Sequence, residues 1–498
     1  MNTRAGNALP IYLDHAASTP IDADVRRALD TAYASPLGVG NPSATTHVFG
    51  KQAAAAIEHA REQLAALIGA ASAELIFTSG ATESDNLALL GVARARASFG
   101  RHLVISKIEH KAVLDSARQL EKQGWQVTRL EPERDGRIDP QAVAAALRPE
   151  TQLVSIMHAN NEVGVAQDIP AIAAVCRARG VLLHSDAAQT VGKLPIDVGA
   201  LGVDLLSFTA HKFYGPKGVG ALYVSTRARP WLEPLFFGGG QERGLRPGTL
   251  PTPLIVGFGV AAQLANRRLA DDALTLERLC VRFRQGLETL GGVRFNDHPR
   301  HRVPGLVSVS IEGVEGESLL AALPELALSS GAACDSASGE PSYVLRALGV
   351  PLEQARSTLR VSFGRDNTEA EVELAAAAIR RAVERLRSRD APGVPAGTGW
   401  RVGEAGSIRE GARVRCFLRV GGDGRIEALE FRAAACPHTE AVLGWLTRRA
   451  LGLRADDPAI GTPLDWQRAC EVPTEKLGRL IVVEDAMRRA LAASALNS

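Results

Sequence analysis

The chain has 498 residues, with 57 Lys and Arg against 55 Asp and Glu, which gives a formal net charge of +2. Because basic and acidic residues nearly balance, the composition shows no basic excess for nucleic acid or for an anionic membrane surface. A chain of this length exceeds what one hydrophobic core usually supports, so we expect about two or three folding units.

The six cysteines lie far apart and form no CxxC pair, unlike a secreted disulfide framework or a closed zinc site. They are Cys176, Cys280, Cys334, Cys416, Cys436 and Cys470. The N-terminal residues lack a continuous apolar stretch behind a basic start, and no apolar run elsewhere reaches about 18 residues. We therefore expect a cytoplasmic protein without a membrane span.

Short aliphatic runs alternate with helix-like segments over residues 74–224, as in an α/β fold with a mostly parallel sheet wrapped by helices. We assign this pattern to a large domain over about residues 20–256. Residues 257–388 open with a long helical pattern, contain the strand-like GLVSVSI and close with an Ala/Glu/Arg helix. This second pattern predicts a smaller α+β domain, which also includes the N-terminal segment.

Pro and Gly concentrate in RSRDAPGVPAGTG without apolar periodicity, so we predict a linker over residues 389–407. A further module is expected over 408–498. There, ARVRCFLRV and RIEALEFRA alternate in polarity on either side of GGDG, which predicts a hairpin. Helical patterns over about 439–451 and 475–493 complete a small α+β domain.

Polar side chains follow several predicted strands at their carboxyl ends, where ligands gather in open α/β sheets. Lys212 follows DLLSF, Asp186 follows VLLHS, His110 follows HLVIS, and SGATES follows LIFT. Taken singly, they are ordinary: a surface lysine, a capping aspartate, a structural histidine and a helix N-cap. Together they offer a Schiff-base lysine, a pyridinium partner, a ring-stacking imidazole and a phosphate cradle, which predicts pyridoxal phosphate.

Residues 10–388 contain YLDHAASTP, FTSGATESDNLA, HSDAAQTVGKLPID, FTAHKFYGPKGVGALYV and SSGAACDSASGEPSYVLRALG. In this combination the segments resemble the cysteine desulfurases of the class V aminotransferase family, in the housekeeping iron–sulfur cluster branch. The resemblance implies a fold-type-I transferase, a homodimer and bound pyridoxal 5'-phosphate. It also implies that L-cysteine becomes L-alanine and a persulfide on Cys334, for iron–sulfur cluster assembly or other sulfur transfer to an acceptor or scaffold protein.

The same resemblance assigns residue roles by matching motif. Lys212 is expected to carry the cofactor, Asp186 to face its ring nitrogen, and His110 to stack on the ring and handle protons. Arg360 is expected to clamp the substrate carboxylate with its planar fork. The remaining assignments are Ala81, Thr82, Thr209 and His211 at the phosphate, Thr249 reaching it from the other subunit, and Asn161 and Gln189 at the phenolic oxygen, with Asn161 also at the substrate.

Cys334 lies among small residues, a composition typical of a loop, whereas Cys176 and Cys280 fall on apolar helix stripes. Relatives commonly have SGSACTSAS where this chain has SGAACDSAS, so Ala332 replaces a serine and Asp335 follows the nucleophile. We expect the Asp335 carboxylate to raise the pKa of the Cys334 thiol by repulsion between like charges.

Residues 408–498 resemble, more weakly, the iron–sulfur scaffold proteins that accept sulfur from such desulfurases, through GRIEALEFRAAAC and VEDAMRRAL. Cys436 matches the middle scaffold cysteine. The other two cysteine positions hold Glu410 and Arg479, and the aspartate and histidine positions hold Ala412 and Gly478. Since a soft iron site normally uses several thiolates, a degenerate domain for docking, dimer packing or covering the acceptor surface is favoured over cluster assembly.

Several alternatives stay open at this stage. A metal site is conceivable on Cys436, with Cys334 as a shared cluster ligand or with His438, Glu440 and Cys470 as new ligands. Cys436 is also a candidate to receive persulfide from Cys334. For the whole chain, the alternatives are a selenocysteine lyase with the same cofactor, or a regulatory fusion whose scaffold-like domain occupies the acceptor surface.

Overall fold

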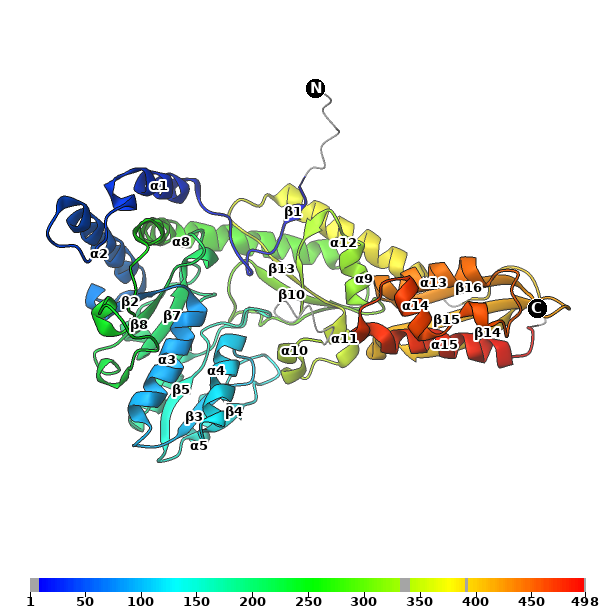
Figure 1. Cartoon of the computed structure of the whole chain (residues 1–498), viewed down its shortest axis with the longest axis horizontal. Helices are drawn as coiled ribbons and strands as arrows, with labels where there is room; N and C mark the ends of the chain where they lie inside the picture. The colour runs from blue at the N-terminus through cyan, green and yellow to red at the C-terminus, as the bar shows by residue number, and fades with distance from the viewer. Residues whose placement is uncertain (1–8, 332–340, 390–392, 497–498) are drawn as a thin grey trace, which may run out of the picture.

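The computed structural model describes residues 9–331, 341–389 and 393–496. Figure 1 shows a large domain, a small domain and a C-terminal module, which follow one another along the long axis. Within these described residues, none of the helices combines the length and the apolarity that crossing a bilayer requires.

The large domain is built on a seven-stranded sheet in the order β2, β8, β7, β6, β5, β3, β4. The strands are β2 Leu75–Thr78, β3 His102–Ser106, β4 Gln126–Leu130, β5 Thr151–Ser155, β6 Leu182–Asp186, β7 Leu205–Thr209 and β8 Gly220–Val224. Every neighbouring pair is parallel except the two pairs that involve β8. The predicted α/β class is confirmed. The sequence analysis missed β4, because its residues QVTRL are largely polar and belong to an edge strand.

Alternate strand residues enter two different hydrophobic cores, one on each face of the sheet. Leu183 and Leu206 pack in one core, and their neighbours Leu182 and Leu205 pack in the other. Because both faces are dry, the strands show continuous aliphatic runs rather than alternating polarity. The helices of this domain are α1 Ala23–Ala34, α2 Val48–Ile68, α3 Ala81–Arg96, α4 Lys111–Lys122, α5 Pro140–Ala146, α6 Ile169–Ala178 and α7 Val198–Leu201.

A single long helix, α8 Thr252–Leu287, connects the large and small domains. Its residues up to Ala265 pack in a large-domain core, whereas residues from Leu276 onward pack in the small-domain core. The predicted boundary between residues 256 and 257 therefore falls inside this helix. In Figure 1, α8 runs from the large domain toward the small one.

The small domain contains an antiparallel sheet in the order β12, β13, β10, β9. Its N-terminal contribution is β1 Ile11–Tyr12, which pairs in parallel with β11 Leu326–Ala327. The other elements are β9 Val293–Phe295, β10 Leu306–Ile311, β12 Ser329–Ser330, β13 Thr358–Ser362, α9 Gly316–Ala321, α10 Tyr343–Ala347, α11 Leu352–Arg356 and α12 Glu369–Arg389.

The C-terminal module is a three-stranded antiparallel sheet packed against helices. It comprises β14 Arg401–Ser407, β15 Ala412–Val420, β16 Ile426–Ala435, α13 Pro437–Ala450, α14 Pro463–Ala469 and α15 Leu477–Ala492. The structure contains the expected hairpin, but residues 401–407 of the predicted linker form β14 instead. A Cβ atom at Gly403 would lie 2.1 Å from the Ala486 carbonyl oxygen, so close packing against α15 requires glycine at this position. Because glycine is unusual inside a strand, the segment does not show the sequence pattern by which a strand is predicted.

A buried ion pair fixes the segment that precedes α8. Arg61 on α2 donates two hydrogen bonds to Glu242, of 2.8 and 2.7 Å, and the Phe77 amide donates a third, of 2.7 Å. The two charged side chains are only 4% and 2% exposed. Glu242 adopts a left-handed backbone conformation, with φ of 47°. The paired carboxylate therefore stabilises an otherwise unfavourable turn.

We expect Arg61→Met to lower the free energy of unfolding by about 3–5 kcal/mol, because it leaves Glu242 buried without its counterion. Arg118→Met is the control, since the Arg118–Asp115 pair is exposed and should contribute about 1 kcal/mol or less. Chemical denaturation of both variants measures the difference. Equal losses would show that the buried pair has no special weight.

Candidate active site

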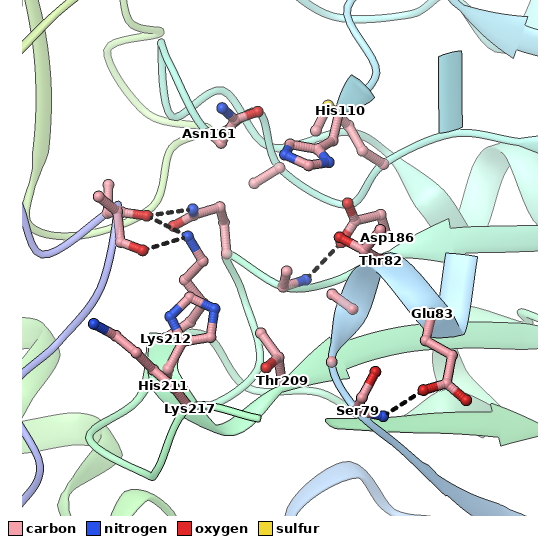
Figure 2. A pocket seen from close by; sticks show the side chains of 18 of the residues that line it. Ser79, Thr82, Glu83, His110, Asn161, Asp186, Thr209, His211, Lys212 and Lys217 are labelled. Carbon is pink, nitrogen blue, oxygen red and sulfur yellow. Dashed lines mark hydrogen bonds between the residues drawn. The ribbon is translucent and has the colours of Figure 1, made fainter. Parts of the chain in front are cut away.

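A cavity of about 540 Å³ lies at the carboxyl ends of the parallel strands and reaches the small domain. Figure 2 shows its side chains converging from loops and helix starts that are far apart in sequence. Ten predicted site residues line it: Ala81, Thr82, His110, Asn161, Asp186, Gln189, Thr209, His211, Lys212 and Arg360.

Three predicted site residues are not part of this lining. Thr249 is exposed, and its predicted role in the other subunit's site stays a prediction. Cys334 lies outside the described residues, as do Ala332 and Asp335. Cys436 is in the C-terminal module, where it is completely buried before α13.

One end of the cavity is suited to an anion. Gly80 precedes α3, and a Cβ added to it would meet only the Thr209 hydroxyl, at 3.8 Å, so the first-turn amides of the helix remain accessible to a ligand. Glu83 also lines the cavity, but its carboxylate is engaged, because it accepts hydrogen bonds from the Ser79 amide and from Arg246. Burial, together with nearby Lys212, lowers the pKa of His211 to about 4. These groups fit a phosphate.

Asp186 ends β6 at the floor of the cavity and accepts a hydrogen bond of 2.9 Å from the Ala188 amide. His110 caps α4, and its Nδ1 accepts from the Ala112 amide at 3.2 Å. Burial lowers the pKa of His110, so the ring is neutral at pH 7. Because Nδ1 is an acceptor in this arrangement, the proton of the neutral ring belongs on Nε2.

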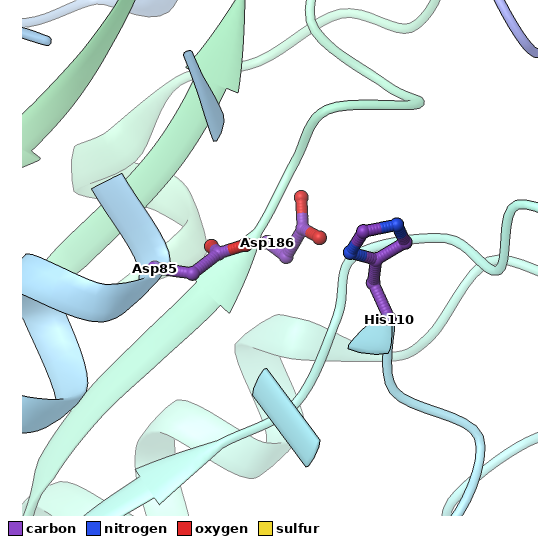
Figure 3. A group of neighbouring side chains, drawn as sticks. All are labelled: Asp85, His110 and Asp186. Atoms are coloured by element: carbon purple, nitrogen blue, oxygen red, sulfur yellow. The ribbon is translucent and has the colours of Figure 1, made fainter. Parts of the chain in front are cut away.

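Further carboxyl groups are buried behind Asp186. One ligand atom each from Asp85, His110 and Asp186 lies within 4.8 Å of the others. Figure 3 shows these three side chains together. Burial and the neighbouring Asp186 raise the pKa of Asp85 well above its usual value. Burial raises the pKa of Glu109 to about 8. Glu109 is therefore mostly protonated at neutral pH, and burial disfavours the charged form of Asp85 as well. Burial also raises the pKa of Asp186, which is the one of these three carboxyl groups that lines the cavity.

This grouping does not require a metal ion, although two carboxylates and an imidazole are potential ligands. His184 lies 3.5 Å from Asp85, but burial lowers the pKa of His184 to about 3, so it supplies no positive charge. A cationic ring nitrogen beside Asp186 would supply one. A buried carboxylate in the cavity wall is the group that a protonated pyridine needs.

Lys212 follows β7 in a short 3-10 turn, η3 Ala210–Lys212. Its Nζ donates to the carbonyl oxygens of Ala16 and Ala17, at 2.7 and 2.9 Å. Both acceptors lie in the segment after β1, so the N-terminal strand of the small domain helps to aim the amine into the cavity. Figure 2 shows both hydrogen bonds.

Arg360 enters the cavity from β13 of the small domain. It donates to the Asn161 carbonyl at 2.9 Å and to the Asp14 carboxylate at 2.8 Å, and its side chain is only 3% exposed. Its Nε has no hydrogen-bond partner among the residues that the structure describes. A buried guanidinium with an unused donor is suited to bind a small carboxylate. Since Lys212 and Arg360 come from different domains, the site exists only when the domains are packed together.

Sequence reasoning missed the supporting groups Asp14, Asp85 and Glu109. Asp85 directly follows the SGATES segment and Glu109 directly precedes His110, so proximity in sequence was the available signal. Burial could not be inferred for either carboxyl, because acidic residues are usually exposed.

A phosphate cradle, a buried carboxyl group in the cavity wall and an enclosed lysine define a fold-type-I pyridoxal phosphate enzyme. The Aminotransferase class-V family matches residues 11–374, and the chain belongs to that family. Pyridoxal phosphate is its cofactor, and the residues present fit it.

Individual proteins within this family are also similar to the chain. The chain is 53% identical over 379 residues to "Cysteine desulfurase IscS" of Pseudomonas entomophila, and 52% identical to that of Azotobacter vinelandii; each match covers 76% of this chain and 94% of the relative. Among solved structures, "NIFS-LIKE PROTEIN" superposes with a TM-score of 0.70 at 34% identity, covering 76% of this chain and all of that one (100%). "SspA in complex with cysteine" gives 0.64 at 38% identity, covering 72% and 100%.

The buried Glu109 makes stability depend on pH. Between its usual pKa of 4.5 and about 8, Glu109 is ionised in the unfolded chain but protonated in the folded one, so folding loses stability as pH rises. We expect Glu109→Gln to remove this loss and to gain up to a few kcal/mol over the native protein by about pH 8. Thermal denaturation across this range measures it. Exposed Glu150→Gln is the control, and parallel curves for all three proteins would contradict the expectation.

Proposed function

We propose that this chain is a pyridoxal phosphate-dependent cysteine desulfurase, which converts L-cysteine to L-alanine and passes the sulfur to Cys334. The observation that carries the proposal is the convergence of Lys212 and Arg360 in one cavity that also holds a phosphate cradle and Asp186. A small amino acid can thus be held by its carboxylate while its amine meets the cofactor. The relatives named above as cysteine desulfurases support this choice of substrate.

Each residue has a definite task in this reaction. Arg360 binds the substrate carboxylate, and Asp14 holds the guanidinium in place. Pyridoxal phosphate, when bound, supplies an electron-withdrawing ring that stabilises negative charge on the substrate carbon beside the amine. Asp186 presents a carboxylate to the ring nitrogen. The Lys212 amine is positioned to move a proton at the substrate carbon, and His110 holds one on Nε2.

The position of Arg360 also supports Cys334 as the sulfur-accepting nucleophile. Ser329 on β12 pairs with Arg360 on β13, and its hydroxyl lies 3.4 Å from the guanidinium. Cys334 follows Ser329 by five residues, which span at most about 17 Å when extended. A thiol tethered there is within chain reach of a substrate bound by Arg360. The Cys334 thiolate would attack the substrate sulfur, forming the S–S bond as the C–S bond breaks, with the electron pair left on carbon.

Cys334→Ala should retain cofactor absorbance but lose alanine production, because binding and sulfur removal use different groups. Lys212→Ala should lose the cofactor linkage itself. Cys470→Ala, which alters a half-buried cysteine of the C-terminal module, is the control and should leave both properties intact. Absorbance and alanine release from L-cysteine are the measurements. Alanine formation by Cys334→Ala at the native rate would exclude this nucleophile, and faster turnover of L-selenocysteine would favour a lyase.

The proposal includes a homodimer in the cytoplasm that donates sulfur to an acceptor protein. Phe236 and Phe237, in the segment before Thr249, are 57% and 86% exposed. If a second copy of the chain covered these rings, Thr249 of the first copy would lie near the phosphate cradle of the second. The described cysteines Cys176, Cys280, Cys416, Cys436 and Cys470 are all free thiols, as a reducing compartment requires.

For residues 401–496 we propose a docked, scaffold-like module that does not assemble clusters. The three positions that correspond to scaffold cysteines meet around Arg479. Its guanidinium interacts electrostatically with Cys436, and its Nε lies 3.3 Å from where a Cβ on Gly411, next to Glu410, would be. A guanidinium thus occupies the space among these positions. Among the described residues, His438, Glu440 and Cys470 are not gathered into a ligand group.

The same cluster fastens the module to the small domain. Arg479 pairs with Glu317 of α9 at 3.2 Å, and Lys476 also pairs with Glu317. Ser318, in the same helix, donates to the Ala435 carbonyl. These contacts are partly or fully buried, so they support a lasting association that covers the α9 face against other proteins.

Glu317→Arg should open this contact, because it places a third cation against Lys476 and Arg479. We expect a larger radius of gyration by small-angle scattering and faster proteolysis near residues 393–400. Glu325→Arg makes the same change at an exposed glutamate and should leave both unchanged. If the two variants behave alike, the ion-pair cluster does not hold the module.

A further inference from the structure

Lys193 lies behind one wall of the cavity and has no assigned role. Its Nζ donates a hydrogen bond of 3.0 Å to Oε1 of Gln189, and Gln189 lines the cavity. Lys193 itself lines a separate small void together with His15, Thr19 and Tyr214. Gln189 therefore stands between Lys193 and the cavity.

The hydrogen bonds around Gln189 fix the direction of its amide. Nε2 donates to the Ala16 carbonyl at 2.9 Å, and the same carbonyl accepts from Lys212 at 2.7 Å. When Lys193 is protonated it can only donate, so it holds the amide oxygen toward itself and directs the NH₂ group to Ala16, on the side that lines the cavity. A flipped amide would place its own oxygen against the Ala16 carbonyl oxygen, and it would present an acceptor to the cavity.

Lys193 also adds positive charge to this wall. Burial and the nearby cations Lys212 and Arg360 lower the pKa of Lys193 to about 7. The two imidazoles that sense its charge, His15 and His211, have pKa values of about 4 and stay neutral. Lys193 is therefore partly charged at neutral pH, on the same side of the cavity as Lys212.

We propose that Lys193 is a positioning residue for pyridoxal phosphate: it holds the Gln189 amide so that its NH₂ group faces the phenolic oxygen, and it places positive charge near Lys212. This inference rests on the proposed roles of Gln189 and Lys212 at the cofactor. Acting through Gln189, Lys193 tightens cofactor binding. Acting through charge, it lowers the pKa of the linkage between Lys212 and the cofactor.

The test uses the full-length holoenzyme and two readouts other than turnover. Lys193→Met removes the donor and the charge but keeps an unbranched side chain. We expect about tenfold weaker cofactor binding, as the loss of a hydrogen bond from a charged group implies. We also expect the pKa of the linkage, read from cofactor absorbance during a pH titration, to rise by up to about one unit, because a nearby cation no longer opposes protonation.

Lys193→Arg restores donor and charge and should recover at least half of both effects, whereas exposed Lys51→Met should change neither. In a Gln189→Leu background, Lys193→Met should weaken cofactor binding no further, which separates positioning from general loss of structure. Unchanged affinity and titration in Lys193→Met would overturn the inference, as would an additive loss in the double variant. Cofactor absorbance that persists in Lys212→Ala would instead overturn the proposed function.

Discussion

The site depends on one constraint, which is that both faces of the central sheet are buried and exclude water. Helices cover both faces of the seven strands, so a polar side chain inside a strand must pair with its neighbours, as His184 does with Ser155 and Ser207. Polar side chains that are to meet a ligand lie where the strands end. Asp186, Lys212 and His110 all occupy such ends, and α3 begins at another. The fold thus gathers polar groups at a single edge of the sheet. Their low-dielectric surroundings strengthen the electrostatic interactions between them.

Charge is distributed unevenly around that edge. Asp85, Glu109 and Asp186 are buried on one side, and burial raises their pKa values, so only part of this acidity is ionised at neutral pH. Lys212, Lys193 and Arg360 lie toward the small domain. A cofactor with a cationic ring nitrogen and an anionic phenolic oxygen matches this polarity. The protein thereby orients the ring through electrostatics as well as through individual hydrogen bonds.

The C-terminal module also contains partly buried charges, and there they form ion pairs with the small domain. Arg479 pairs with Glu317 of the small domain. An ion pair between two modules is stable when both charges are partly desolvated and well paired. This pair therefore joins the C-terminal module to the small domain, and Cys436 is enclosed in the same module.

Local patterns in the sequence alone determined the α/β class, the hairpin of the C-terminal module and the places of Lys212, Asp186, His110 and SGATES at strand ends. The family resemblance added Asn161, Gln189, Thr209, His211 and Arg360, and all five line the cavity. The sequence could not reveal β4 or β14, since an edge strand and a glycine packed against α15 leave no such pattern. Only the tertiary structure decided that Asp85 and Glu109 are buried, that Lys193 lies behind Gln189 and that Arg479 meets Glu317. Burial and pairing depend on residues far apart in the chain, and they decide which groups carry charge.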